Sequence, residues 1–414
     1  MNVPDSDSED ELPPGWEERV TMDGSVFYAN HLTKLTQWTH PRTGKKKLVS
    51  GELPYGWERC VDKNTGKVIY VDHDNKRTTY TDPRLAFAVE EKDHANDYRQ
   101  RFDASSTALQ VLHGRDLTNK VALITGANSG IGFETARALA KHGCTVIFAC
   151  RNMLSAQECV YKIVAEKGSA RCEIVHLDLK SLESVKECVK DVKNNFKKID
   201  MVILNAGVCG IPYSKTGDGF ETTFQVNYLG HFYLALLLRP LVPVGGRFVV
   251  VSSESHRFAD LTTETISPGT LSVESKNYWG MLVYNNSKLC NVLFARLFAK
   301  KLQDSGISVF SLHPGNMVYS KLCNSWWFYK LIFYISRPFT KSLLQAASTS
   351  VFCATAQELN GTTGVYFNNC YRCQESSAAQ DDELAENLWD ISCDMVRQVL
   401  GPDAEALSTP ESPL

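Results

Sequence analysis

A tyrosine and a lysine four residues apart, Tyr284 and Lys288, are the residues best suited to chemistry. On a helix this spacing puts both side chains on one face, about one turn apart. An ammonium group beside a phenol favours the phenolate and lowers the phenol pKa from its usual value of about 10. Tyr284 could then act as general acid in carbonyl reduction or as general base in alcohol oxidation. A bare Tyr-x-x-x-Lys pair is more often an ordinary exposed helix pair, so the interpretation depends on neighbouring motifs.

A glycine-rich turn upstream of this pair could bind the phosphates of a dinucleotide. Gly126, Gly130 and Gly132 follow a short apolar run, Val121–Ile124, and precede a helical pattern, Ile131–His142. Glycines lack Cβ, so the backbone can approach a pyrophosphate, and the helix N-terminus directs free N–H groups at it. The spacing is Gly-x-x-x-Gly-x-Gly rather than the commoner Gly-x-Gly-x-x-Gly, so alone it also fits a structural turn.

Apolar runs alternate with helical patterns from Asp116 onward. The predicted strands are Val121–Ile124, Thr145–Ala149, Arg171–His176, Met201–Leu204, Arg247–Val251, Ser308–Leu312 and Gly364–Phe367. The later predicted helices are Leu154–Glu166, Ser181–Phe196, Phe220–Leu238, Tyr284–Gln303 and Leu343–Ala356. Most runs are apolar without alternation, as buried parallel strands require. The pattern predicts a doubly wound α/β sheet that binds a nucleotide at the carboxyl ends of its strands.

Two copies of a short unit precede this part of the chain. Leu12–Trp16 recurs as Leu53–Trp57, and Thr36–Pro41 recurs as Thr78–Pro83. Each unit has three short alternating runs with turn residues between them, which predicts a three-stranded antiparallel sheet.

The repeats resemble WW domains. The resemblance implies that Trp16, Tyr28 and Pro41 clamp one face of the first sheet, as Trp57, Tyr70 and Pro83 clamp the second. It implies that the other face binds Pro-Pro-x-Tyr ligands, with a first groove made by Phe27, Ala29, His31 and Trp38. Phe27 stands where the family usually has tyrosine, but flat aromatic walls still suit a polyproline II helix. The second groove has Ile69, His73 and Tyr80 and lacks both usual aromatics, so we expect weak binding or a role in supporting the first domain.

The α/β part resembles the short-chain dehydrogenase/reductase family over about residues 116–400. The motifs that carry the resemblance are Thr125-Gly126-x-x-x-Gly130-Ile131-Gly132, Asn205-Ala206-Gly207, Asn227, Ser252-Ser253, Tyr284-x-x-x-Lys288 and Pro314-Gly315. They imply a seven-stranded Rossmann-type sheet in the order 3-2-1-4-5-6-7. They imply a nicotinamide cofactor held by Thr125, Gly126, Asn128, Ser129, Gly130, Ile131, Gly132, Asn205, Ala206, Gly207, Tyr284, Lys288, Pro314 and Gly315. Ser253 would hydrogen-bond the substrate oxygen, and Asn227, inside the fourth helix, would hold a water that links Lys288 to solvent.

One spacing departs from the family pattern. Ser253 precedes Tyr284 by 31 residues, more than is usual in the family. The extra residues, about 255–281, contain Tyr278 and Trp279, which we expect to form part of the substrate wall. Ser252 is the alternative catalytic serine.

The end of the second strand bears on cofactor choice. An acidic residue there would bind the adenosine ribose 2′-hydroxyl, but the sequence has Ala149-Cys150-Arg151-Asn152. Arg151 suits a 2′-phosphate through charge-assisted hydrogen bonds, which favours NADP(H), unless it merely faces solvent. Asp178 should meet the adenine.

Two further features leave alternatives open. The aromatic run Trp326–Tyr329 could line a pocket for a flat lipophilic substrate such as a steroid or retinoid, contact a membrane surface peripherally, or belong to the core. Cys370 and Cys373 form a lone Cys-x-x-Cys pair, which favours buried thiols over a redox pair. A zinc site would need a second pair, so no metal is predicted.

Composition sets the remaining limits. A net charge of −3 gives no general attraction to nucleic acid, and 13 cysteines without a secretory signal indicate reduced thiols in a cytosolic compartment. No apolar run is long enough for a spanning helix. Lys45–Lys47 is either a nuclear signal or a solvated linker.

The predicted parts are a disordered acidic N-terminus (1–11), first WW domain (12–43), basic linker (44–52), second WW domain (53–85), linker (86–115), reductase domain (116–400) and disordered tail (401–414).

The order of the domains is itself unusual and resembles a family of reductases that carry two WW domains. The resemblance implies a cytoplasmic signalling protein with nuclear and mitochondrial pools, associated with transcriptional regulators, cell-death control, tumour suppression and Wnt signalling. Two hypotheses remain: a reductase positioned by its WW domains, or an adaptor whose reductase half senses the cofactor. The presence of Tyr284 and Lys288 favours catalysis, because a sensor would need only the glycine turn.

Overall fold

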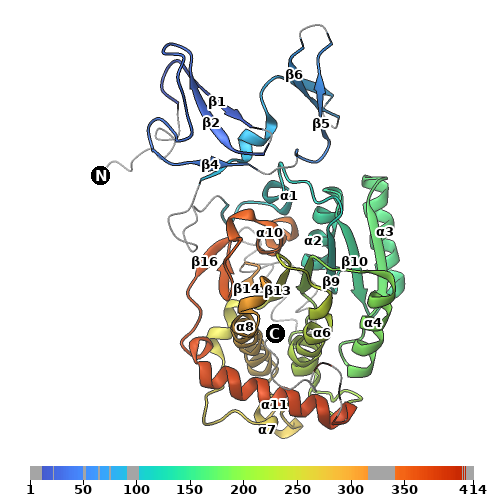
Figure 1. Cartoon of the computed structure of the whole chain (residues 1–414). Coiled ribbons are helices and arrows are strands. Elements are labelled where there is room, and N and C mark those ends of the chain that lie inside the picture. The colour runs from blue at the N-terminus through green and yellow to red at the C-terminus, as the bar shows by residue number, and fades with distance from the viewer. Residues whose placement is uncertain are drawn as a thin grey trace. The chain divides into compact units, whose positions relative to one another are not determined.

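The computed structural model describes residues 12–21, 23–49, 53–63, 66–73, 76–90, 102–315, 341–402, 404 and 406. The acidic N-terminus, the aromatic run Trp326–Tyr329 and most of the predicted tail lie outside these residues. The chain divides into two compact units (Figure 1). The first comprises Met1–Tyr98 with His113–Thr118, and the second comprises Arg99–Leu112 with Asn119–Leu414.

The first unit contains two three-stranded antiparallel sheets, as predicted. Their strands are β1 (Trp16–Val20), β2 (Val26–Asn30) and β3 (Thr36–Gln37), then β5 (Trp57–Val61), β6 (Val68–Asp72) and β7 (Arg77–Thr79). Sheets this small have little core, so a buried tyrosine anchors each one. The Tyr28 hydroxyl bonds the Glu18 carboxylate at 3.0 Å, and the Tyr70 hydroxyl bonds Asp82 Oδ2 at 2.7 Å.

The segments predicted as linkers contain regular structure. Within the basic linker, β4 (Lys47–Leu48) pairs with β8 (Val89–Glu90), which follows a short helix, η1 (Pro83–Phe87). Lys47 Nζ lies 3.5 Å from Glu18 Oε1, so this lysine is part of the fold of the first unit rather than only a solvated charge. In the second unit, α1 (Ala108–Val111) has a capping box made by Thr107 and Gln110 and packs against α10 (Leu343–Thr355).

The second unit is built on one eight-stranded sheet with the order β11-β10-β9-β12-β13-β14-β15-β16. Its strands are β9 (Val121–Thr125), β10 (Thr145–Cys150), β11 (Arg171–His176), β12 (Met201–Leu204), β13 (Arg247–Val251), β14 (Ser308–His313), β15 (Val365–Asn368) and β16 (Tyr371–Cys373). The first seven are parallel in the predicted order. The eighth, β16, was not predicted. It turns back antiparallel because Asn369 and Cys370 both adopt positive φ, at 55° and 59°, as a two-residue hairpin requires.

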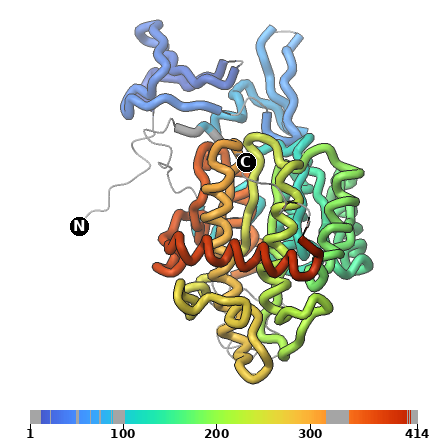
Figure 2. Tube along the Cα trace, turned by 60° about the horizontal axis from the view of Figure 1, so that its bottom comes forward, coloured from blue at the N-terminus to red at the C-terminus, as the bar shows by residue number. Residues whose placement is uncertain are grey.

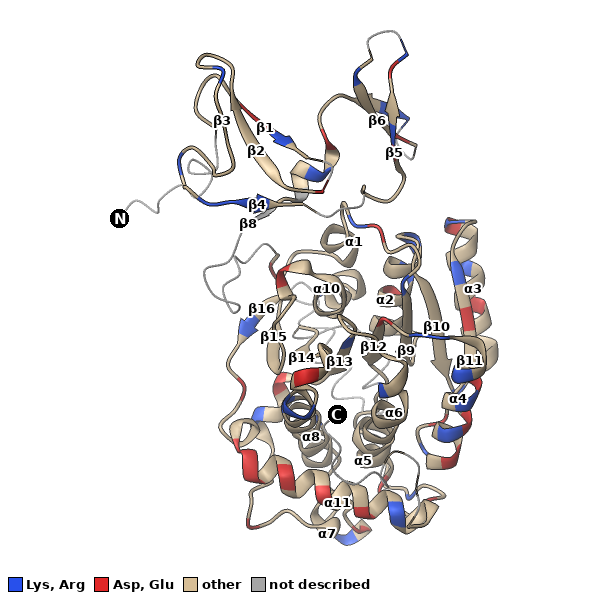
Figure 3. Ribbon diagram, in the orientation of Figure 1, with Lys and Arg blue, Asp and Glu red and all other residues tan. Residues whose placement is uncertain are grey.

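Helices cover both faces of this sheet (Figure 1). The main ones are α2 (Gly130–Lys141), α3 (Met153–Glu166), α4 (Leu182–Asn195), α6 (Gly230–Leu238), α8 (Gly280–Lys301), α10 (Leu343–Thr355) and α11 (Asp382–Leu400). The C-terminal helix α11, also absent from the prediction, crosses over α8 (Figure 2). Acidic and basic side chains are intermixed along α3 and α4, whereas those of α11 are mostly acidic (Figure 3). Within the described residues, no helix combines the length and apolar character needed to cross a membrane.

Candidate active site

The glycine turn has the geometry of an anion-binding helix start. Gly126 and Gly130 adopt φ of +66° and +57°, which side chains with a Cβ rarely tolerate. Helix α2 begins at Gly130, and its N-cap residue Ser129 makes no side-chain capping bond within the described chain. The first N–H groups of α2 are therefore available to an anion such as a diphosphate.

Gly132 is required by the packing beneath this turn. A Cβ there would lie 2.5 Å from Asn205 Nδ2 and 2.6 Å from the Gly126 carbonyl oxygen. Asn205 Nδ2 itself donates to the Thr125 carbonyl at 2.9 Å. The Thr125 hydroxyl oxygen accepts the N–H groups of Asn205 and Ala206 at 2.8 and 2.9 Å. Thr125 therefore holds the Asn205-Ala206-Gly207 motif against the glycine turn, and it does not itself line the cavity.

One cavity of about 370 Å³ brings most of the predicted site residues together. The predicted residues that line it are Gly126, Asn128, Ser129, Gly130, Ile131, Gly132, Arg151, Asp178, Asn205, Ala206, Gly207, Tyr284, Lys288 and Pro314. The alternative serine, Ser252, also lines it, whereas Thr125, Asn227, Ser253 and Gly315 are not among the lining residues. Those that the sequence reading missed include Leu177, Leu179, Lys180, Val208, Val226 and Val251. Several of these directly follow predicted strand ends, a signal that could have identified them.

Tyr284 and Lys288 lie near the start of α8, and both are buried. Lys288 Nζ lies 5.6 Å from the centre of the Tyr284 ring and donates to the Val251 carbonyl at 3.0 Å. Burial lowers the pKa of Lys288 to about 8, because desolvation disfavours the charged ammonium. The ammonium still predominates at neutral pH, so a positive charge stands beside the phenol.

The two neighbouring serines have different surroundings. The Ser252 hydroxyl is buried and donates to the Lys288 carbonyl at 2.7 Å, which ties β13 to α8. Ser253 Oγ accepts the Ser255 N–H at 3.2 Å and begins a short helix, η4 (Glu254–Phe258). Its own hydroxyl hydrogen can be donated to a substrate oxygen. Ser252 lines the cavity but its hydroxyl hydrogen is bonded to α8, so the assignment of Ser253 as the substrate-facing serine stays a prediction.

Asn227 lies in a π-helical turn, Gln225–Leu229, that interrupts the helix predicted over Phe220–Leu238. Its Oδ1 accepts the Val208 N–H at 2.7 Å, while Nδ2 donates to the Val208 carbonyl at 2.9 Å and to Ser287 Oγ at 3.0 Å. The side chain thus joins the segment after β12 to α8. Sequence periodicity does not predict a π turn, since it depends on these through-space contacts.

A buried histidine that the sequence reading missed links these motifs. His231 Nε2 lies 2.9 Å from Thr125 Oγ1, and Nδ1 lies 3.1 Å from the Asn227 carbonyl oxygen. Because Thr125 Oγ1 already accepts two amide hydrogens, its own hydrogen points to Nε2, and Nδ1–H donates to Asn227. Complete burial lowers the pKa of His231 to about 4, so it stays neutral. In the sequence, the only feature that distinguishes His231 is its place as a polar residue inside an apolar helical run.

Residues after β10 and β11, where we expect the adenosine, also line the cavity. Arg151 is exposed and lines the cavity, and Asn152 caps α3 by accepting the Ser155 N–H at 3.0 Å. Asp178 Oδ1 accepts the Lys180 N–H at 3.0 Å.

The insert after Ser253 forms η4, α7 (Pro268–Leu271) and η5 (Ser275–Asn277). The Tyr278 hydroxyl donates to the Ile211 carbonyl at 2.6 Å, and Trp279 is largely exposed. Among the described residues neither lines the cavity, so their place in a substrate wall stays a prediction.

The predicted peptide groove of the first WW domain is open. Phe27 and Trp38 meet edge to face with ring centres 5.9 Å apart, and Trp38 is 55% exposed. His31 Nε2 lies 2.6 Å from Glu17 Oε2. In the second domain, Tyr80 is exposed and His73 contacts Glu58 in the same way.

The Cys-x-x-Cys pair belongs to the β15–β16 hairpin. Cys370 is buried with its Sγ 3.7 Å from Ser348 Oγ, and burial raises the pKa of its thiol to about 11. Cys373 is partly buried, and burial raises its thiol pKa as well. Both cysteines therefore stay protonated, which suits packing better than redox exchange. The described residues contain no cluster of three or more potential metal ligands.

Comparisons with known proteins agree with this geometry. The WW domain model matches residues 12–41 and 53–83, and the short chain dehydrogenase model matches residues 120–260. WW domain-containing oxidoreductase from Drosophila melanogaster is 54% identical over 401 residues, covering 96% of this chain and 98% of that protein. The protein of the same name from Homo sapiens is 51% identical, with coverage of 96% and 97%. Retinol dehydrogenase 12 from Mus musculus is 39% identical over 287 residues, covering 68% of this chain and 87% of that protein.

Solved structures show the same α/β fold. An uncharacterized protein from Mycobacterium paratuberculosis has a TM-score of 0.56 at 27% identity, covering 72% of this chain and 97% of that one. A short-chain type dehydrogenase/reductase from Mycobacterium marinum, at 20% identity and a TM-score of 0.50, covers 61% of this chain and 94% of its own. Because the sequence similarity runs through both repeats and the α/β unit, the chain belongs to the WW domain-containing oxidoreductases, which are short-chain dehydrogenases preceded by two WW domains.

Proposed function

We propose that this chain is an NADP(H)-dependent oxidoreductase that acts on the carbonyl or alcohol group of a lipophilic substrate. The observation that carries the proposal is one cavity lined by Arg151 after β10, by the glycine turn after β9, and by Tyr284 and Lys288 on α8, which packs on β13 and β14; β10, β9, β12, β13 and β14 follow one another across the sheet. This arrangement matches the chemical order of a dinucleotide: adenosine, diphosphate, then nicotinamide.

The residues present fit such a cofactor and divide the work among them. The N–H groups at the start of α2 would hold the diphosphate, and Lys288 would hold the nicotinamide ribose. NADP(H), when bound, supplies or accepts the hydride. Tyr284 donates the proton to the carbonyl oxygen during reduction and takes it back during oxidation. Ser253 donates a hydrogen bond to the same oxygen, where negative charge develops.

The cofactor assignment depends on Arg151. We expect NADPH to bind more tightly than NADH, and Arg151→Asp to weaken NADPH binding by about tenfold or more by removing charge-assisted bonds to the 2′-phosphate. Fluorescence titration of both nucleotides measures this. Arg171→Ala, at an exposed arginine that starts the next strand, is the matched control and should change neither affinity. Tighter NADH binding by the unmodified protein would contradict the assignment.

Retinoids are the substrate class we propose to test first. One relative is named retinol dehydrogenase 12, and its similarity covers 68% of this chain. All-trans-retinal with NADPH is therefore the first assay. Failure to reduce it, with steroids and simple aldehydes reduced, would move the substrate to another class and leave the reaction type intact.

The first WW domain would tether this activity to partner proteins that contain Pro-Pro-x-Tyr. Its open aromatic pair, Phe27 and Trp38, supports this role. The same groove favours a second candidate function, an adaptor in transcriptional, Wnt-type or cell-death signalling whose reductase unit only senses the cofactor. In cells, a phenotype that survives Tyr284→Phe but not Trp38→Ala would select the adaptor.

A further inference from the structure

The serine and the tyrosine of the site are joined by a long covalent path. Ser253 and Tyr284 lie 31 residues apart, separated by the insert of short helices described above. Catalysis needs both groups at one substrate oxygen with a tolerance of well under 1 Å. The Ser252 bond to the Lys288 carbonyl fixes the preceding residue to α8, so a further non-covalent link is needed to fix Ser253 and the turn after it.

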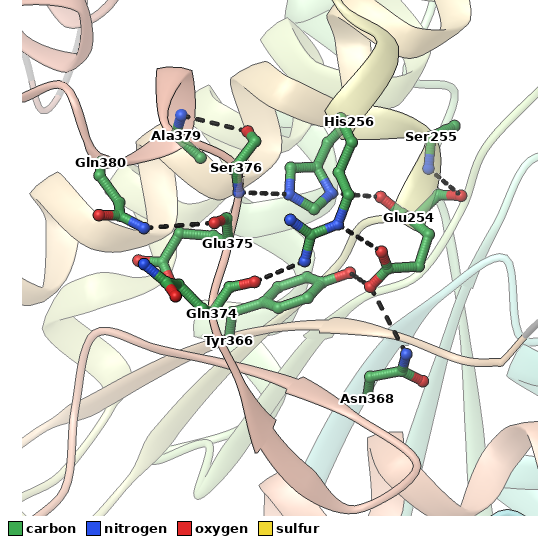
Figure 4. A network of polar contacts seen from close by, with 12 residues as sticks. Glu254, Ser255, His256, Tyr366, Asn368, Gln374, Glu375, Ser376, Ala379 and Gln380 are labelled. Carbon is green, nitrogen blue, oxygen red and sulfur yellow. Dashed lines mark hydrogen bonds and ion pairs between the residues drawn. The ribbon is translucent and has the colours of Figure 1, made fainter.

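Figure 4 shows a polar network that contains such a link. His256 Nδ1 lies 2.7 Å from the Ser253 carbonyl oxygen, and the Ser376 N–H donates to His256 Nε2 at 3.1 Å. An amide can only donate, so Nε2 must be the unprotonated nitrogen. Nδ1 therefore carries the hydrogen and donates it to the Ser253 carbonyl, which also accepts the His256 backbone N–H at 3.1 Å.

The environment of the imidazole keeps it neutral. His256 is 1% exposed, and its ring lies 5.1 Å from the ring of Tyr366. Burial lowers the pKa of His256, and Arg257 lowers it further, whereas Glu254 and Glu375 act in the opposite direction. The neutral ring with hydrogen on Nδ1 is the form that both contacts require.

Ser376, at the other end of this link, belongs to a segment that is bound to α8, the helix that carries Tyr284. Arg296 on α8 donates to Glu375 Oε1 at 2.7 Å and to the Gln380 carbonyl at 3.4 Å. It therefore holds residues 375–380 against α8, and Ser376 lies within that segment. One path from serine to tyrosine therefore runs through Ser253, His256, Ser376, Arg296 and α8. A shorter one runs from the end of η4 to α8, where Asn285 Nδ2 donates to the Phe258 carbonyl at 3.3 Å.

A second contact holds the same turn at the neighbouring residue. Glu254 accepts the Tyr366 hydroxyl at 3.0 Å and the Arg257 Nε–H at 2.6 Å. Arg257 also donates to the Gln374 carbonyl. The turn after Ser253 is thus fastened both to β15 and to the segment after β16 (Figure 4).

We propose that His256 is a positioning residue for Ser253, holding the serine in register with Tyr284 through the segment at residues 375–380. This rests on the proposed function, because it presumes that Ser253 faces the substrate. The His256 side chain does not touch the substrate in this account and acts only through Ser253.

A double-mutant cycle with all-trans-retinal and NADPH tests the proposal in the full-length protein. His256→Gln keeps a polar group near the Nε2 position but removes the donor to Ser253. We expect kcat to fall about tenfold or more, with the KM for NADPH unchanged, because only the serine moves. In a Ser253→Ala background the same substitution should cause no further loss. Equal losses in both backgrounds, or no loss in either, would overturn the proposal.

Hydrogen exchange gives a readout that does not depend on turnover. In His256→Gln the amides of residues 253–258 should exchange faster, while the glycine turn at 126–132 keeps its protection. His142→Gln is the control, since His142 makes a comparable bond to the Ala138 carbonyl at the far end of α2. Unchanged exchange at 253–258 would refute the link even if no substrate were turned over. An active Tyr284→Phe variant would instead refute the proposed function, so the two failures are distinguishable.

Discussion

The charge of Lys288 is set by its burial. Its pKa is lowered to about 8, so the ammonium predominates below that pH and is lost as the pH rises through it. We expect NADPH to bind more weakly above about pH 8, because the neutral amine attracts the ribose hydroxyls less. Fluorescence titrations across the pH range measure this.

Lys288→Met provides the control for this pH dependence. It should bind NADPH weakly at every pH and show no alkaline change. An affinity of the unmodified protein that stays constant to pH 10 would show that the lysine charge is not used.

The packing around Gly132 leaves no room for a side chain. Gly132→Ala forces a methyl group against Asn205 and the Gly126 carbonyl, which we expect to cost about 1–3 kcal/mol of folding free energy and to weaken NADPH binding. Urea unfolding and NADPH titration measure the two effects. Gly168→Ala meets nothing within 4 Å and should behave as wild type. Equal stability of the two variants would contradict the packing described here.

Single residues also show which features of the site can be predicted from the sequence and which cannot. Tyr284 and Lys288 were predictable because they lie one turn apart on one helix. The glycines were predictable because they lie within one short turn. His231 and His256 were not, because each acts by joining segments far apart in the chain. Each histidine has one partner three or four residues earlier, but no spacing in the sequence predicts the distant partner, Thr125 or Ser376.

At the scale of elements, α11 stabilises the helices that carry the site. Trp389 on α11 packs against Phe232 on α6 and against Phe294 and Phe298 on α8, with ring centres 5.1, 6.1 and 6.2 Å away. Trp389→Ala should lower the free energy of unfolding by about 3 kcal/mol through the lost packing. Chemical denaturation checks this against Glu386→Ala, an exposed position on the same helix. A loss no greater than that of the control would mean that α11 contributes little.

Elements were predictable to the extent that their pattern is local. Most of the seven parallel strands followed from uninterrupted apolar runs, whereas β16 and the pair β4–β8 are too short to give a pattern. The π turn at Asn227 and the insert after Ser253 depend on contacts across the fold. Helix α11 carries an amphipathic pattern, so its sequence is sufficient to predict a helix there.

At the scale of the whole molecule, the two WW domains should differ in function. Trp38→Ala removes one wall of the first groove and should weaken binding of a Pro-Pro-x-Tyr peptide by more than about tenfold. Tyr80→Ala, at the corresponding exposed position of the second domain, should change the affinity little. Fluorescence polarisation with full-length protein measures both. If Tyr80→Ala causes the larger loss, the grooves have been assigned in the wrong order.

The claim on which the account depends is that Tyr284 transfers a proton beside a bound nicotinamide. The most direct measurement is NADPH-dependent reduction of all-trans-retinal by the unmodified protein and by Tyr284→Phe, with NADPH affinity determined for both. We predict that Tyr284→Phe lowers kcat by about 100-fold or more while the NADPH dissociation constant stays within about twofold. Undiminished turnover by Tyr284→Phe would contradict the account.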